Sequence, residues 1–136
     1  MKKFRKAIAL CSLCSLVLLS SSITPVSAAN DWDGFQNVTI GLSFGTLGRA
    51  DFYTSVIPSV GTYYSTITMK LQRYSGGSWH TLASGTHGET GSNLFSSSYY
   101  VTKGYTYRVH STVTIYKSKG GAKINSDTFT YKNSYK

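Results

Sequence analysis

The sequence predicts an all-β protein, an antiparallel β-sandwich of about seven short strands, and two observations support this. From residue 30 onward, Ser, Thr and Tyr occupy 41 of 107 positions. β-Branched and aromatic side chains lose rotamer freedom in a helix but suit a pleated sheet. In addition, apolar residues recur at every second position in several short segments that turn signals separate. This combination disfavours helices and is typical of a sandwich.

The first half of the predicted domain contains three alternating segments. Apolar residues fall at every second place in 38–44 and again in 50–56, and Pro58 marks the turn that follows. The third segment, 66–72, alternates in the same way and leads into 75–78, which reads Ser-Gly-Gly-Ser. Paired glycines adopt positive φ readily, so this sequence predicts a tight β-hairpin.

The second half contains a polar stretch and the longest alternating run. A return strand is expected over 79–84, followed by a polar, Gly-rich loop over 85–92. A weaker strand over 94–101 precedes the long run over 105–116. After a turn at 118–121, a last strand is expected over 124–131.

Residues 1–29 have the features of a secretory signal peptide. Four basic residues lie within the first six positions, and 7–19 is an apolar stretch of 13 residues. A polar segment, 20–29, follows and ends in small residues, so we expect cleavage after Ala28 or Ala29. The apolar stretch is shorter than the about 20 residues that cross a bilayer as a helix. We therefore expect a secreted, extracellular protein.

Residues 30–136 are expected to form a single β-sandwich domain. They contain ten basic and five acidic side chains, which leaves a net charge of +5. Both cysteines, Cys11 and Cys14, precede the cleavage site, so no disulfide can stabilise the domain and its stability must come from the core. No second long apolar segment occurs, so we expect no transmembrane segment in the processed chain.

Two motifs carry a resemblance to known proteins. The segment 71–79 has the pattern Leu-x-Arg-x-Ser-x-Gly-Ser-Trp, and 103–109 has the pattern Lys-Gly-Tyr-x-Tyr-Arg-Val. With its surroundings from about 66 to 116, this pair resembles small secreted proteins of Gram-positive bacteria assigned to domains of unknown function. The resemblance implies a sandwich of immunoglobulin or fibronectin type, an exported location and a Gram-positive source. It implies no activity.

Catalysis and metal binding find little support. Gly41–Gly45 has the letters of the Gly-x-Ser-x-Gly nucleophile elbow, but Ser43 lies in an alternating strand with no helix after it. His87 and Glu89, with His80, are conceivable metal ligands, yet His87 and Glu89 fall in the predicted loop, which lacks rigid support. We therefore predict a non-enzymatic protein without a metal or cofactor.

Surface recognition is the more plausible role. Tyr and Trp present flat apolar faces that can stack on sugar rings, and basic side chains attract anionic polymers. Aromatic residues beside the hairpin turn, the outward face of 105–116 and lysines around the next turn are the candidates, although some of them are expected to fill edges or the core. These predicted binding residues are Tyr74, Trp79, Arg108, His110, Tyr116, Lys117, Lys119 and Lys123.

The candidate partners are an anionic wall polymer, a polysaccharide or a membrane surface. Nucleic acid is not expected, because the charge of +5 is modest and no nucleic-acid-binding motif is present. The leading hypothesis is a secreted module that binds or coats an extracellular polymer or the cell envelope. The alternative is a cationic, bacteriocin-like antimicrobial protein that acts on a competitor's envelope.

Overall fold

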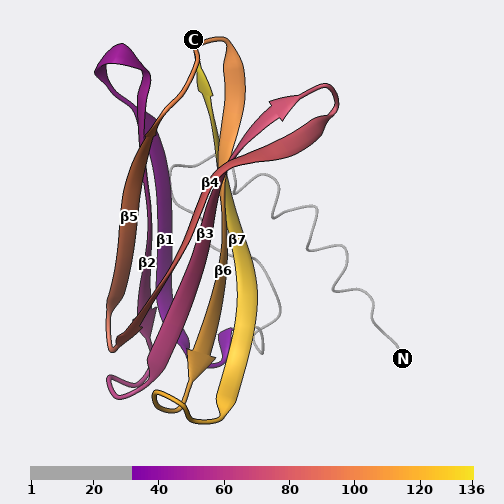
Figure 1. Cartoon of the computed structure of the whole chain (residues 1–136). Helices are drawn as coiled ribbons and strands as arrows, with labels where there is room; N and C mark the ends of the chain where they lie inside the picture. The colour runs from indigo at the N-terminus through magenta and orange to yellow at the C-terminus, as the bar shows by residue number, and fades with distance from the viewer. Residues whose placement is uncertain (1–31) are drawn as a thin grey trace.

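The computed structural model describes residues 32–136, so the predicted signal peptide lies outside the described residues. Seven antiparallel strands form two packed layers (Figure 1). The strands are β1 (Phe35–Phe44), β2 (Arg49–Pro58), β3 (Tyr64–Ser75), β4 (Ser78–Thr90), β5 (Asn93–Tyr100), β6 (Tyr105–Tyr116) and β7 (Lys123–Tyr135), with a 3₁₀ turn at Thr46–Gly48. The predicted β-sandwich is confirmed. Among the described residues, no helix is long and apolar enough to span a membrane.

The strand order identifies the type of sandwich. One sheet has three strands in the order β1-β2-β5, and the other has four in the order β4-β3-β6-β7. In the immunoglobulin constant-type arrangement, the fourth strand lies beside the fifth. Here β4 pairs with β3 instead, which is the arrangement of the fibronectin type III variant.

Alternate side chains of both sheets form one core. Val38, Ile40 and Phe52 of the three-stranded sheet are buried, as are Ile67, Leu71, Val109 and Val113 of the four-stranded sheet. Four polar residues, Thr54, Ser65, Asn93 and Ser111, are also buried, and the hydroxyls of Thr54 and Ser111 are hydrogen-bonded at 2.6 Å across the sheets. Because each hydroxyl satisfies the other, the alternating pattern can include them at little cost.

Tyr107 ties the start of β6 to the preceding turn. Its side chain is fully buried, and its hydroxyl donates to the carbonyl of Thr102 at 2.5 Å and accepts from the amide of Thr102 at 3.1 Å. A tyrosine that bonds back to the backbone at this corner is a hallmark of immunoglobulin-like sandwiches. The second Tyr of the Tyr-x-Tyr motif is therefore structural.

The predicted loop over 85–92 is wrong: most of it is the second half of β4, and only Gly91 and Ser92 separate β4 from β5. Two glycines in this segment, Gly85 and Gly88, interrupt the alternation of apolar and polar residues that would have predicted a strand. A Cβ on Gly85 would lie 2.9 Å from Cζ of Phe95, and one on Gly88 would lie 2.8 Å from Cζ of Tyr64. Glycine is needed here because aromatic rings pack against the strand.

The hairpin between β3 and β4 projects from the body of the sandwich (Figure 1). Gly76 and Gly77 have φ values of 61° and 84°, which fit the tight turn that the sequence predicts. The pairing of β3 with β4 shifts between Leu71 and Gln72, so that Leu82 is the extra residue of a β-bulge. A bulge bends its strand and increases the local twist, which accounts for the projection.

Candidate functional site

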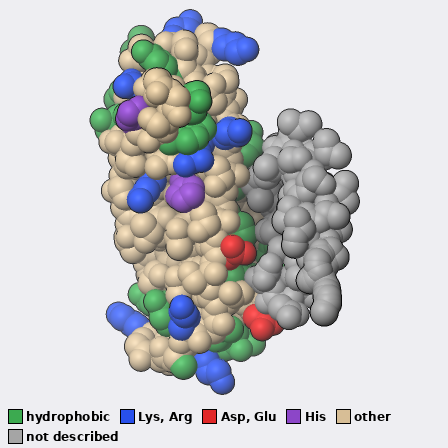
Figure 2. All heavy atoms as spheres, turned by 90° about the vertical axis from the view of Figure 1, so that its right-hand side faces the viewer, with side chains coloured by type: hydrophobic (Ala, Val, Ile, Leu, Met, Phe, Trp, Pro, Cys, Tyr) green, Lys and Arg blue, Asp and Glu red, His purple; other side chains and the backbone are tan. Residues whose placement is uncertain are grey.

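The eight predicted binding residues fall into two groups at opposite ends of the four-stranded sheet. Arg108 and Tyr116 both lie on β6, eight residues apart, which corresponds to about 26 Å in an extended strand. Figure 2 shows Lys and Arg side chains toward both ends of this face, with mostly uncharged polar surface between them. The hairpin-end cluster comprises Tyr74, Trp79, Arg108 and His110; the far-end group comprises Tyr116, Lys117, Lys119 and Lys123.

The hairpin-end cluster brings two aromatic rings and a guanidinium group into contact. The rings of Tyr74 and Trp79 pair across the hairpin, with centroids 5.1 Å apart. The guanidinium carbon of Arg108 lies 4.3 Å from the centroid of the Trp79 ring, in the geometry of a cation–π contact. Arg108 Nε also donates to Gln72 Oε1 at 2.7 Å. Two neutral partners therefore orient this arginine without neutralising its charge.

Burial and neighbouring charges shape the electrostatics of this cluster. Partial burial lowers the pKa of Arg108, which remains protonated at neutral pH. Burial also lowers the pKa of His110, and the positive charges of Arg108 and Lys70 lower it further. His110 is therefore neutral at pH 7, and the positive charges on the outer face at this end are those of Arg108, Lys70 and Lys132, which lies beside Arg108 on β7.

Among residues 32–136, no carboxylate occupies an outward position of the four-stranded sheet. Among the described residues, its outward positions carry Ser, Thr, Gln, Lys, Arg, His and aromatic side chains, with one Gly. The two acidic residues of this sheet, Glu89 and Asp127, lie opposite Ser65 and Val113 and share their inward orientation on the edge strands. An anionic ligand on the outer face would thus meet positive charge without an opposing carboxylate.

Rows of hydroxyl groups run across the strands of this face, between its two ends. The register places Thr86, Thr68, Thr112 and Thr128 in one row across all four strands. The Thr68 and Thr86 hydroxyls are 3.1 Å apart, and those of Thr112 and Thr128 are 3.4 Å apart. Such a surface offers many donors and acceptors to a polyhydroxylated ligand.

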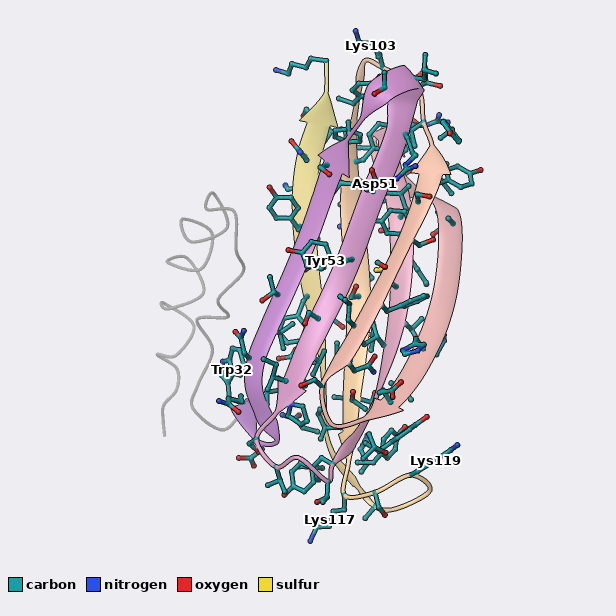
Figure 3. All side chains as sticks on the ribbon, turned by 90° about the vertical axis from the view of Figure 1, so that its left-hand side faces the viewer. Trp32, Asp51, Tyr53, Lys103, Lys117 and Lys119 are labelled. Atoms are coloured by element: carbon teal, nitrogen blue, oxygen red, sulfur yellow. The ribbon has the colours of Figure 1, made fainter. Side chains whose placement is uncertain are left out.

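The far-end group forms a basic tip. The rings of Tyr64 and Tyr116 lie 6.1 Å apart at the end of the sheet. Lys117 begins the turn to β7, and its amide donates to the carbonyl of Ala122 at 2.9 Å. Figure 3 shows Lys117 and Lys119 at this tip, pointing away from the body.

Of the residues considered for catalysis or metal binding, His87 and Glu89 lie together, with Nε2 and Oε1 3.7 Å apart, whereas Ser43 and His80 lie elsewhere in the sandwich. Ser43 lies within β1 in register with Asp51, in a strand rather than a nucleophile elbow. His87 is paired with Asn93, Nδ1 to Oδ1 at 2.8 Å, and its ring stacks on Phe95. His80 lies beside the hairpin turn, with Nε2 3.0 Å from the carbonyl oxygen of Ser75. Within residues 32–136, no three His, Cys, Asp or Glu side chains are grouped to hold a metal.

Sequence reasoning missed Gln72, Lys70 and Lys132 as parts of the hairpin-end cluster. Their outward orientation follows from strand alternation, but their proximity to Arg108 depends on the pairing of β3, β6 and β7. Comparison with known proteins finds no matching family model and no matching curated sequence.

Proposed function

We propose that this chain is a secreted, non-enzymatic protein that binds an anionic extracellular polymer through the outer face of its four-stranded sheet. The main support is the combination of Trp79 and Arg108 on a face whose described outward positions carry no carboxylate. An anionic wall polymer or acidic polysaccharide supplies both the negative charge and the polyhydroxylated chain that this face complements.

Each part of the face contributes a different interaction. Arg108 donates paired hydrogen bonds to a phosphate or carboxylate group, because its planar guanidinium matches two oxygens. Lys70 and Lys132 add positive charge that attracts the polymer from a distance and is screened by salt. Trp79 and Tyr74 pack against the carbon skeleton of the polymer, and the threonine rows bond its hydroxyls.

The test is retention of the processed protein on immobilised poly(glycerol phosphate), with uncharged dextran as the reference matrix. Arg108→Gln should lower the affinity about tenfold, because a hydrogen bond to a charged group is lost. Lys103→Gln is the matched control: it removes one positive charge from the turn between β5 and β6, outside the face, and should change the affinity less than about twofold. Equal losses in both variants, or none in Arg108→Gln, would contradict the proposal.

The far-end group favours a second candidate, a cationic antimicrobial protein. Lys117, Lys119 and Lys123 surround one exposed turn next to Tyr116 and Tyr64, an arrangement that suits anionic lipid headgroups. Growth inhibition of related bacteria and leakage of phosphatidylglycerol vesicles should then occur, and both should be lost when the three lysines are replaced by Gln. A protein inert across a broad panel of species would remove this candidate.

A further inference from the structure

A groove crosses the outer face of the other sheet, remote from the hairpin-end cluster. It has a volume of about 530 Å³, within the range of about 300–1,000 Å³ typical of small-molecule sites. Residues of β1, β2 and β5 line it together with Tyr131 of β7, and Figure 3 shows Asp51 and Tyr53 on this face. None of the eight residues predicted from the sequence lines this groove.

Tyr53 forms an aromatic platform in the groove. It lies opposite Gly41 on β1, and a Cβ at position 41 would lie 2.9 Å from Cζ of the Tyr53 ring. The ring therefore rests against the backbone of β1, which only glycine permits, and this contact fixes its orientation. The side of the ring away from β1 remains accessible, and Tyr53 is 37% exposed.

A balanced ion pair lies beside this platform. Arg49 Nε donates to Asp51 Oδ1 at 2.9 Å, and the two side chains are 53% and 42% exposed. The pair presents a hydrogen-bond donor and an acceptor side by side with no net charge. Ser43, Ser96 and Ser98 add hydroxyl groups to the lining of the groove, which also includes Ser97 and Tyr131.

We infer that this groove is a binding site for a neutral oligosaccharide of hexopyranose units with equatorial hydroxyls. Such a ring has a flat, apolar C–H face, which packs on Tyr53. Two neighbouring hydroxyls of the sugar then donate to the Asp51 carboxylate and accept from the Arg49 guanidinium. The ligand is neutral because Asp51 cancels the charge of Arg49. The site is separate from the anionic-polymer face in its sheet and its chemistry.

Isothermal titration of the processed protein with cellotetraose tests this inference. The wild-type protein should bind, and Tyr53→Ala should weaken binding at least about tenfold, as expected when an aromatic anchor is truncated. Tyr53→Phe keeps the ring and is the matched control for folding, and its affinity should stay within about threefold of wild type. Asp51→Asn should weaken binding about threefold, because a charged acceptor becomes a neutral one.

Testing each variant with both ligands distinguishes the two sites. Trp79→Ala should leave cellotetraose binding unchanged even if retention on poly(glycerol phosphate) is lost, and Tyr53→Ala should leave that retention unchanged. The inference is overturned if the wild-type protein does not bind cellotetraose or if Tyr53→Ala binds it as tightly as wild type. A loss of cellotetraose binding in Trp79→Ala alone would place the sugar at the hairpin end and also overturn it.

Discussion

The outer faces of the two sheets each carry an arginine and an aromatic residue, but the partners of the two arginines differ. Arg49 on the three-stranded sheet pairs with the carboxylate of Asp51, whereas Arg108 on the four-stranded sheet bonds the neutral amide of Gln72. The first arrangement cancels the positive charge and leaves directional donors and acceptors. The second holds the guanidinium in place while its charge remains available to a ligand.

The aromatic residues show the same contrast. Tyr53 lies against the backbone of β1, next to hydroxyl groups and a balanced ion pair. Trp79 lies under the guanidinium of Arg108 on a projecting hairpin. If the two proposals hold, the immediate neighbours of an aromatic ring, rather than the ring itself, determine whether a face binds a neutral or an anionic polymer.

The largest expected effect comes from making the two faces alike. Gln72→Glu gives Arg108 a carboxylate partner at the position from which Gln72 Oε1 now accepts. Affinity for poly(glycerol phosphate) should fall about 10- to 100-fold, because the added carboxylate cancels the charge of Arg108 and competes with the polymer for its hydrogen bonds. Retention on the polymer at low salt measures this.

Gln72→Asn is the control for that change, since it keeps an amide without adding charge. An unchanged affinity in Gln72→Glu would mean that the neutral partner of Arg108 is irrelevant and that the contrast between the faces has no functional meaning.

The stability of the sandwich should change independently of ligand binding on either face. Tyr107→Phe removes the hydroxyl that bonds Thr102 and leaves two backbone groups without that partner, which should lower the free energy of unfolding by about 1–3 kcal/mol. The melting temperature should fall by about 4–8 °C for each kcal/mol lost. Calorimetry gives this value, and both ligands should still bind well below the transition. If Tyr107→Phe lost the binding of only one ligand, the contact between Tyr107 and Thr102 would be needed for binding on that face.

The strands were largely predictable from the sequence, because inward residues such as Ile40 and Val109 alternate with polar ones. The loop predicted at 85–92 was wrong because Gly85 and Gly88 provide space for aromatic rings, which a one-dimensional pattern does not reveal. Arg49 and Asp51 are two residues apart on one strand, so alternation alone could have placed them together, and the pattern was overlooked.

The hairpin-end cluster was predictable only in part. The positions of Tyr74 and Trp79 follow from the hairpin turn, but the contact between Arg108 and Gln72 depends on which strands are neighbours and in which register. The same limit explains why all eight residues were predicted as one candidate set although they lie at two ends of the sheet: sequence alternation shows which face a side chain is on but not which residues of different strands are close together.

The smallest expected effect concerns pH. His110 on the four-stranded sheet has a lowered pKa, so it becomes protonated only at a pH below that at which a histidine usually does. Affinity for the phosphate polymer should then increase by about two- to fivefold, since one partly exposed charge contributes about 0.2–1 kcal/mol. His110→Gln should abolish this rise, and cellotetraose binding should not share it. A rise of equal size in the variant would assign it to another group.

The same shift has the opposite consequence for folding. Because the unfolded chain binds the proton at a higher pH than folded His110 does, the free energy of unfolding should decrease as the pH falls from about 6.5 through the folded pKa. His110→Gln should reduce that decrease when unfolding by denaturant is compared across this range.

The most direct test of two chemically distinct faces is amide NMR mapping of the ¹⁵N-labelled processed protein, titrated separately with soluble poly(glycerol phosphate) and with cellotetraose. The account predicts that the phosphate polymer shifts outward residues of β3, β4 and β6 around Arg108, whereas cellotetraose shifts residues around Tyr53 on β1, β2 and β5. Shifts from both ligands on the same sheet, or no localised shifts from either, would contradict it.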